Sequence, residues 1–348
     1  MGIARENIER LDPYVPGYQP EGNNVIKLNT NENPYPPSDK VLEAIRQAAS
    51  EKLRLYPDSL WKGLRKTASK IYEIGEDYLF FGNGSDEILS LIFKAFIDKN
   101  DYVVSPYPTY SYYKVMANIQ DARFEYIDTD NLFNIPFDSL ADCGAKMICF
   151  ANPNTPTGIF EETSTIENFL NSFSGLLILD EAYIDFAKES AYRLAAKYNN
   201  LIVTRTFSKS FSLCGIRVGY CFANPELIKI LLKVKESYNI NALSQIAAKS
   251  ALEDIFYSKQ NTEKIVKTRD RYTEKFRKLG FFVLPSASNF IFIKHEKFFA
   301  KDIFDFLFSK NIYVRYFELR RLDKYLRITI GREDEMSCLI DALSTFIV

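Results

Sequence analysis

Short apolar runs alternate with helix-like segments between about residue 75 and residue 235, and this alternation constrains the fold more than any other feature of the sequence. The runs are YVVS at 102, FEYI at 124, MICFA at 147, LLILD at 176, LIVT at 201 and VGYCFA at 218. Such alternation is typical of a mostly parallel sheet with helices on both faces. Continuous apolarity within a run suits strands that are covered on both sides. We therefore predict an α/β fold with a mostly parallel central sheet.

After about residue 240 the pattern changes to long helical stretches followed by short strands. Helices are expected over 242–256 and 259–279, and strands in FFVL, NFIFI, IYVR and YLRITI. The chain closes on EDEMSCLIDALSTF, a segment with acidic residues at the end where a helix dipole favours them. One face of that segment carries Met336, Leu339, Ile340 and Leu343. This part is expected to form a smaller α+β domain.

Three parts of the chain are therefore expected. The first 30 or so residues are too rich in Pro, Asn and Tyr to form a regular element, and we expect an arm over residues 1–35 that contributes to the small domain. A large ligand-binding domain follows over residues 36–240. The small domain covers residues 241–348.

Charge and composition exclude several classes of function. The 348 residues include 44 Lys and Arg against 45 Asp and Glu, so no basic excess favours nucleic acid or an anionic membrane. Apolar runs are far shorter than the roughly 20 residues that span a bilayer. The charged N-terminus does not resemble a signal peptide. A cytoplasmic location is expected, and the five Cys, without any C-x-x-C, are expected to be reduced structural thiols.

The chain has one histidine, His295, in the polar stretch IKHEKF, where we expect a solvated turn. A single histidine in that place argues against Ser-His-Asp or Cys-His catalysis and against histidine-rich metal sites. No metal is expected. Chemistry must then come from Lys, Tyr, Asp or a bound cofactor.

Polar motifs follow the predicted strands directly. NPNTPTG follows MICFA, DEAY follows LLIL, and RTFSK follows LIVT. An open α/β sheet binds its ligand beyond the carboxyl ends of its strands, so these motifs are candidates for one site. FGNGSDE places Gly84, Ser85 and Asp86 before the apolar helix Ile88 to Phe96, where free backbone N–H groups can bind an anion. An ordinary turn is the alternative interpretation of this motif.

Two residues suggest what the ligand is. Lys209 lies between Ser208 and Ser210, without a carboxylate beside it in sequence, and partial burial would make its amine a nucleophile that condenses with aldehydes. Asp180 ends an apolar strand, where a carboxylate is costly unless it meets a cation such as a protonated pyridine nitrogen. A solvated lysine and a helix-capping aspartate are the alternatives.

Together these motifs resemble the fold-type-I pyridoxal-phosphate aminotransferases, and within them the histidinol-phosphate aminotransferase subfamily. The resemblance runs along nearly the whole chain, through LDPYVPGY, LNTNENPYPP, YPD, GNGSDE, PTYSYY, NPNTPTG, DEAYIDF, TFSKSFSLCGIRVG and LRITIG. It implies pyridoxal 5'-phosphate as the cofactor of the large domain. It also implies reversible amino transfer between L-histidinol phosphate and 2-oxoglutarate, giving imidazole acetol phosphate and L-glutamate, in histidine biosynthesis.

The resemblance also implies roles for individual residues. Lys209 would bind the cofactor aldehyde and move the proton during catalysis. Asp180 would keep the ring nitrogen protonated, while Tyr183 and Asn154 would hydrogen-bond the phenolate oxygen of the ring. Tyr110 would stack on the ring. The implied phosphate site contains Gly84, Ser85, Asp86, Thr206, Ser208 and Arg217.

Substrate and subunit contacts follow from the same resemblance. Arg327 would bind the acidic group of the substrate, and Arg315, Tyr18 and Asn29 favour a phosphorylated amine that carries a ring. Tyr56 would reach the cofactor phosphate of a second subunit, so a homodimer is expected.

The sequence departs from the family pattern at one position and leaves rival functions open. Many relatives carry Asn directly before Pro-Thr-Gly, where this chain has Thr155, so Asn152 is a second candidate for the contact given to Asn154. An aromatic-amino-acid aminotransferase, a threonine-phosphate decarboxylase and a non-catalytic binding protein of the same fold are the alternatives.

Overall fold

The computed structural model describes residues 2–13, 16–22 and 24–347. Tyr14 and Val15 of the LDPYVPGY motif therefore lie outside the described residues. No helix in the described ranges is long and apolar enough to cross a membrane.

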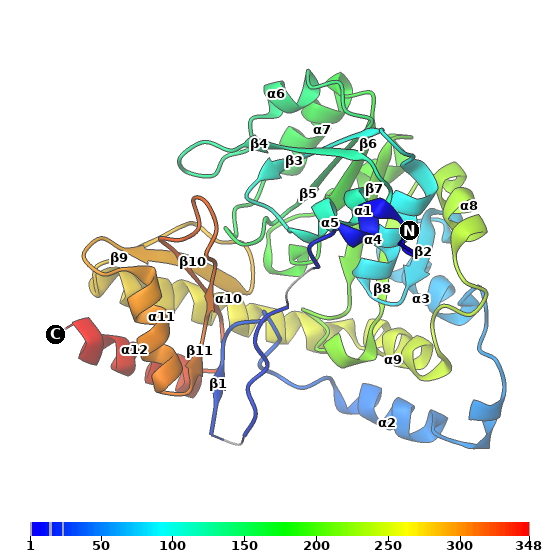
Figure 1. Ribbon diagram of the computed structural model, residues 1–348. Coiled ribbons are helices and arrows are strands. Elements are labelled where there is room, and N and C mark those ends of the chain that lie inside the picture. Colours follow the sequence, from blue (N-terminus) through cyan, green and yellow to red (C-terminus); the bar gives the residue numbers. More distant parts are fainter. Residues whose placement is uncertain (1, 14–15, 23, 348) are drawn as a thin grey trace.

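A seven-stranded sheet forms the centre of the described chain, as predicted (Figure 1). Its strands in spatial order are β2 (Leu79–Gly82), β8 (Gly219–Ala223), β7 (Leu201–Thr206), β6 (Leu176–Asp180), β5 (Met147–Ala151), β3 (Tyr102–Tyr107) and β4 (Arg123–Asp128). Strands β7, β6, β5, β3 and β4 are parallel, whereas β8 is antiparallel to both β7 and β2. The predicted α/β class is confirmed. The sequence pattern did not identify β2.

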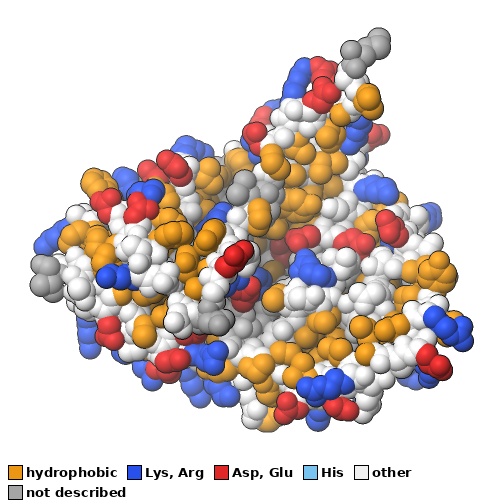
Figure 2. All heavy atoms as spheres, turned by 60° about the horizontal axis from the view of Figure 1, so that its bottom comes forward, with side chains coloured by type: hydrophobic (Ala, Val, Ile, Leu, Met, Phe, Trp, Pro, Cys, Tyr) orange, Lys and Arg blue, Asp and Glu red, His pale blue; other side chains and the backbone are white. Residues whose placement is uncertain are grey.

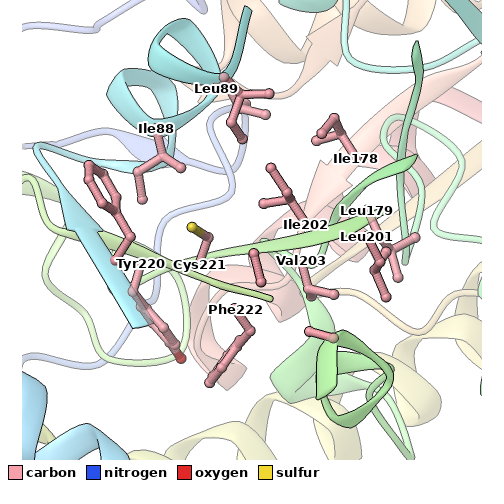
Figure 3. Packing of buried hydrophobic residues seen from close by; sticks show 14 of the residues in the cluster. Ile88, Leu89, Ile178, Leu179, Leu201, Ile202, Val203, Tyr220, Cys221 and Phe222 are labelled. Carbon is pink, nitrogen blue, oxygen red and sulfur yellow. The ribbon is translucent and has the colours of Figure 1, made fainter. Parts of the chain in front are cut away.

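Both faces of the central strands are buried. Every residue of β2, β5, β7 and β8 is buried, and neighbouring residues of a strand point to opposite faces. Figure 3 shows Ile88 of α4 (Ser85–Phe96) above the face on which Ile202 and Cys221 project, while Phe222 projects from the other face. Strand β4 differs because it lies at the sheet edge and alternates between exposed and half-buried residues.

Two smaller sheets lie in the other part of the molecule. One is antiparallel, in the order β12 (Arg315–Tyr316), β13 (Leu326–Thr329), β10 (Phe290–His295) and β9 (Phe281–Val283). The other pairs β1 (Ile26–Lys27) with β11 (Ile312–Tyr313) in parallel. The predicted strand IYVR is thus two strands, because its halves pair with different partners on either side of buried Val314.

The arm contains regular structure, contrary to the expectation of none. Besides β1 it has a short helix, α1 (Glu6–Glu9). Asn7 Nδ2 donates to the Asn118 carbonyl at 2.8 Å, at the end of α5 (Tyr112–Ile119), so the arm crosses onto the large sheet's helices. These contacts of the arm join residues more than 100 positions apart, so no local pattern in the arm's own sequence predicts them.

Helices cover the sheets and connect the two parts. The remaining helices are α2 (Asp39–Ala48), α3 (Lys62–Tyr72), α6 (Phe137–Ala141), α7 (Thr163–Ser172), α8 (Pro225–Val234), α9 (Ala242–Glu253), α10 (Ile255–Lys278), α11 (Ala300–Ser309) and α12 (Glu333–Ile347). Figure 1 shows α10, in yellow, running from the small sheets to α9 below the large sheet. The expected pair of long helices is separated by Asp254 alone, and α11 was not predicted.

His295 ends a strand and is not a solvated turn residue. Its Nδ1 accepts from the Lys297 N–H at 3.1 Å, and its Nε2 lies 3.3 Å from the Leu279 carbonyl. The ring packs against Phe281 and Phe298. Phe298 belongs to the stretch IKHEKF itself, whereas Phe281 begins β9 and is brought to the ring only by the pairing of β9 with β10.

Candidate active site

Residues at the carboxyl edge of the large sheet meet the arm and the small antiparallel sheet. Asp180 ends β6, Lys209 and Arg217 follow β7, and NPNTPTG follows β5. Arg327, in β13 of the small antiparallel sheet, donates to Thr155 Oγ1 of that motif at 3.1 Å. Figure 2 shows one face of the molecule, hollowed near its centre, with acidic and basic side chains beside the hollow.

The start of α4 has the features of a phosphate site. Gly84 precedes the helix with φ 83°, and among the residues that the structure describes no side chain forms a capping hydrogen bond at the helix start. The Arg217 guanidinium lies against it, so a Cβ on Gly84 would come 2.5 Å from Arg217 Nη2. Arg217 Nη1 donates to Ser208 Oγ at 3.4 Å, and Thr206 Oγ1 donates to Ser208 Oγ at 3.0 Å. Free N–H groups, a guanidinium and two hydroxyls suit a phosphate group.

Asp86 of this motif pairs with Arg217 and also reaches the predicted stacking residue. Its Oδ2 lies 3.1 Å from Arg217 Nη2, and its Oδ1 accepts from the Tyr110 hydroxyl at 3.2 Å. Arg217, which precedes β8, is therefore linked through Asp86 to the start of α4. The Tyr110 hydroxyl is held by the same carboxylate. Its ring meets Tyr113 edge to face, with centroids 5.5 Å apart.

Gly219 lets β8 approach the start of α4 closely, and alanine at this position is expected to disrupt the predicted phosphate site there. An added Cβ would lie 2.4 Å from the Ser85 nitrogen and 2.5 Å from the Gly84 carbonyl carbon, which are backbone atoms. Overpacking of this kind costs about 1–3 kcal/mol, so we expect cofactor affinity to fall roughly tenfold or more. Gly215→Ala is the matched control, because a Cβ there meets nothing within 4 Å. Equal affinities by equilibrium dialysis for the two variants would contradict the prediction.

Asp180 is a buried carboxylate held by neutral donors. It accepts from the Tyr113 hydroxyl at 3.0 Å, the Thr204 hydroxyl at 3.2 Å and the Ala182 N–H at 3.1 Å. Burial raises the pKa of its carboxyl to about 6, although these hydrogen bonds act in the opposite direction. No Lys or Arg of the described ranges forms an ion pair with it. A protonated ring nitrogen would supply the missing cation, so Asp180 fits a pyridoxal ring.

The Asp180 pKa predicts how the stability of the cofactor-free protein depends on pH. The folded carboxyl keeps its proton up to about pH 6, whereas its ordinary pKa is 3.8. Between these values the folded state binds more protons, so its stability falls as pH rises, by about 3 kcal/mol in total from this group. Urea unfolding of wild type and Asp180→Asn from pH 4 to 7 measures the effect. A constant difference between the two proteins across this range would contradict it.

Three successive arm residues meet the catalytic candidates. Arg327 Nη2 donates to the Asn29 carbonyl at 3.0 Å, and Lys209 Nζ lies 3.3 Å from the Thr30 carbonyl. Asn31 Nδ2 donates to the Tyr183 hydroxyl at 2.9 Å. Lys209 has no carboxylate within ion-pair distance among the residues that the structure describes. Segment 29–31 therefore sets the relative positions of the lysine, the tyrosine and the arginine.

Asn31 is the arm residue that sequence reasoning missed. It is buried in the left-handed region with φ 56° and bonds the Thr329 hydroxyl through both its backbone N–H and its Oδ1. Tyr113 and Thr204, which hold Asp180, were also missed. Thr204 could have been found, because it directly faces Asp180 once β6 and β7 are aligned.

The other predicted substrate residues are placed unequally. Arg315 pairs with Arg327 across β12 and β13, and both guanidiniums lie against the Phe317 ring. Asn29 Nδ2 donates to the Tyr18 carbonyl at 2.7 Å. The Tyr18 ring is half exposed and packs on Phe308 and Tyr313, so the structure brings its backbone, and not its ring, toward Asn29.

The two asparagine candidates of NPNTPTG differ in their partners from each other and from Thr155. Both oxygen and nitrogen of the Asn152 amide bond the Glu161 backbone. Asn154 Nδ2 donates to the Pro108 carbonyl at 2.9 Å and to Thr157 Oγ1 at 3.0 Å. Thr155 is buried and touches Arg327. The predicted contact of Asn154 with the cofactor stays a prediction.

Tyr56 lies on the surface. Its side chain is 80% exposed and stacks on Tyr238, with ring centroids 4.5 Å apart. Within the described ranges no hydrogen bond or ring contact joins it to the start of α4 in its own chain.

Comparison with known proteins identifies the family. Residues 23–343 match the family model "Aminotransferase class I and II". The chain is 42% identical to the histidinol-phosphate aminotransferase of Clostridium beijerinckii over 97% of this chain and 95% of that protein. It is also 42% identical to that of Brachyspira hyodysenteriae, over 98% of both. The crystal structure of the Sinorhizobium meliloti enzyme in complex with pyridoxal-5'-phosphate superposes with a TM-score of 0.91 at 27% identity, covering 100% of this chain and 98% of that one. This chain belongs to the class I and II aminotransferase family, and within it to the histidinol-phosphate aminotransferases.

Proposed function

We propose that this protein is a pyridoxal-phosphate enzyme that reversibly transfers the amino group between L-histidinol phosphate and 2-oxoglutarate, in L-histidine biosynthesis. The products are imidazole acetol phosphate and L-glutamate. The observation that carries the proposal is the 42% identity to curated histidinol-phosphate aminotransferases over nearly the full length of both chains. We also propose that the protein is cytoplasmic, as the sequence predicts.

The site residues support this chemistry. When bound, the cofactor supplies an aldehyde that condenses with amines and a ring that takes up electrons. We assign its phosphate to the N–H groups at the start of α4, with Arg217, Ser208 and Thr206 around them. Asp180 would hold a proton at the ring nitrogen, since its buried carboxylate has only neutral donors. Tyr110 would cover the ring face.

Lys209 would carry out the proton transfer. Its amine would accept the proton that leaves the substrate carbon and would release it again beside the bound cofactor. The Thr30 carbonyl and the Tyr183 ring, 5.7 Å away from the amine, hold it at the carboxyl edge of the sheet. Tyr183 accepts from Asn31 and so keeps its own hydroxyl hydrogen for the ring oxygen.

Arg327 and Arg315 would bind the anionic end of the substrate. They are neighbours on adjacent strands, and together they present two guanidiniums to one acidic group. Two planar donors suit a phosphate or a carboxylate, so one site can take both histidinol phosphate and 2-oxoglutarate in turn. Charge alone does not distinguish the rival amino donors, and a comparison of substrates must do so.

The test of the proposed function compares amino donors. Enzyme loaded with pyridoxal phosphate is mixed with L-histidinol phosphate, phenylalanine, tyrosine or threonine phosphate, and the cofactor spectrum and released carbon dioxide are followed. We expect conversion to the pyridoxamine form to be fastest with histidinol phosphate, without carbon dioxide. Faster reaction with an aromatic amino acid, carbon dioxide from threonine phosphate, or no spectral change with histidinol phosphate would reject the proposal.

We further propose a homodimer in which Tyr56 reaches the cofactor phosphate of the partner subunit. Supporting this, the exposed Tyr56 ring stacks on exposed Tyr238, and the sequence around Tyr56 carries three further exposed apolar side chains, Leu53, Leu55 and Leu60. Mixing Lys209→Arg subunits with Tyr56→Ala subunits gives heterodimers in which one site keeps both residues. Activity that neither variant has alone would support the exchange of Tyr56 between subunits. A monomer in solution with full turnover would exclude it.

A further inference from the structure

A cavity between α10 and two loops of the large sheet is not used by the proposed chemistry. It has a volume of about 540 Å³. Phe160, from the loop after β5, and Phe186, from the segment after β6, line one wall, and α10 with Ala287 lines the other. The Ala287 N–H donates to the Gly158 carbonyl at 2.8 Å, so the two walls are joined directly. A concave space of this size between two parts of a chain is typical of small-molecule sites. We call it the α10 cavity.

One face of α10 gives the cavity a polar group on either side of an apolar middle. Thr262, Val266 and Arg269 all line it, and their spacing of four and three residues places them on the same face of the helix. Thr262 and Arg269 are 7% and 8% exposed, and Val266 between them is half-buried. Seven residues correspond to roughly 10 Å along the helix axis. The two polar groups are therefore separated by about the length of a small ring-bearing molecule.

Both polar side chains have hydrogen-bonding capacity that the protein does not use. The Thr262 hydroxyl oxygen is buried and has no hydrogen-bond partner among the described residues. Arg269 donates through Nε to Asp270 and through Nη1 to the Ser288 carbonyl, both at 3.0 Å, which leaves its Nη2 without an acceptor in the same part of the chain. The Asp270 side chain is 63% exposed, so water weakens its attraction for the guanidinium. A ligand that bonds these two groups recovers the free energy lost by burying them unpaired.

The other charged side chains that line the cavity are already paired or balance one another. Asp185 lies 3.7 Å from Arg205. Lys188 lies 2.5 Å from Glu162. The two that remain are exposed on α10 and opposite in sign: Glu263 and Lys267. The buried guanidinium is thus the charge that a ligand would meet inside the cavity, and it favours an anion.

We propose that the α10 cavity is a second binding site, which takes a small carboxylate with a ring and with a hydrogen-bonding oxygen at the end opposite the carboxylate. The carboxylate accepts from Arg269 Nη2, and the far oxygen bonds the Thr262 hydroxyl. The ring packs on Val266, between Phe160 and Phe186. This inference goes beyond the proposed function and does not depend on it, because none of these residues is assigned to the cofactor or to the amino donor.

Calorimetric titration of the enzyme loaded with pyridoxal phosphate tests the site with two probes, 4-hydroxybenzoate and benzoate. We expect saturable binding of both. Thr262→Val keeps the shape of the side chain and removes the hydroxyl, so it should weaken 4-hydroxybenzoate about fivefold and leave benzoate unchanged. Val266→Phe fills the middle of the cavity and should weaken both probes at least about tenfold.

Arg327→Gln is the control for binding at the proposed substrate site. It should bind both probes as wild type does. Probes that are lost from Arg327→Gln and kept by Val266→Phe occupy the substrate site, which would overturn the proposal. So would the absence of saturable binding to wild type, or equal affinity of 4-hydroxybenzoate for wild type and Thr262→Val. Melting temperatures check the fold of each variant, and if Val266→Phe does not fold, the two probes on Thr262→Val decide. If wild type failed to react with histidinol phosphate, the proposed function would fall while these affinities could still be read.

Discussion

Arginine in place of Lys209 is expected to reduce amino transfer by at least about 10⁴-fold. Arginine keeps the positive charge and can still donate to the Thr30 carbonyl, so the fold around position 209 should persist. It cannot lose its proton at neutral pH, and it therefore supplies neither the nucleophile nor the proton carrier. Turnover with histidinol phosphate and borohydride reduction followed by peptide mass measurement check the two losses together.

Lys249→Arg is the matched control for that substitution. Lys249 is partly exposed on α9 and lies 3.5 Å from Glu253, outside the site. The Lys249→Arg variant should retain full turnover. After borohydride reduction, it should carry the cofactor on the peptide that contains Lys209. Intact turnover in Lys209→Arg, or cofactor mass on another peptide of wild type, would show that the catalytic amine has been assigned to the wrong residue.

The large sheet could be predicted from the sequence because its strands are buried on both faces. An apolar run such as MICFA leaves a local trace that needs no knowledge of its neighbours. The elements that were missed lack this trace. Strand β1 depends on pairing with β11, nearly 300 positions later, and β11 is separate from β12 because β12 pairs with β13 instead of with the arm. Exposed β4 was found, although its burial differs from that of the central strands.

The same physical distinction applies to the site. Asp180, Lys209 and the NPNTPTG motif could be located because parallel strands end at one edge of a sheet. The hydrogen-bond partners of the motif's side chains could not be predicted, because they include the Pro108 carbonyl and Arg327 of β13, which are distant in sequence. Asn31 was recognised only as part of a motif. Its bond to Tyr183 becomes visible when the arm is placed against β13.

Behind the site lies a buried ion pair whose loss should strongly destabilise the protein. Arg205 Nε lies 3.0 Å from Glu181 Oε2, and the two side chains are 7% and 0% exposed. Arg205 Nη1 also lies 3.7 Å from Asp185 Oδ1, and Asp185 accepts from the Ser210 hydroxyl beside Lys209. The pair thus connects the residue after Asp180 with the residue after Lys209.

We expect Arg205→Met to cost about 3–5 kcal/mol of unfolding free energy, because it leaves the Glu181 carboxylate buried without its cation. Burial raises the pKa of Glu181 and Arg205 lowers it, so the variant would bind a proton at this site or unfold more easily. Adding Glu181→Gln removes the unpaired charge, and the double variant should recover part of the lost stability in urea unfolding. A double variant as unstable as Arg205→Met alone would mean that the packing of the guanidinium against Tyr72, Tyr192 and Phe222 matters more than its charge.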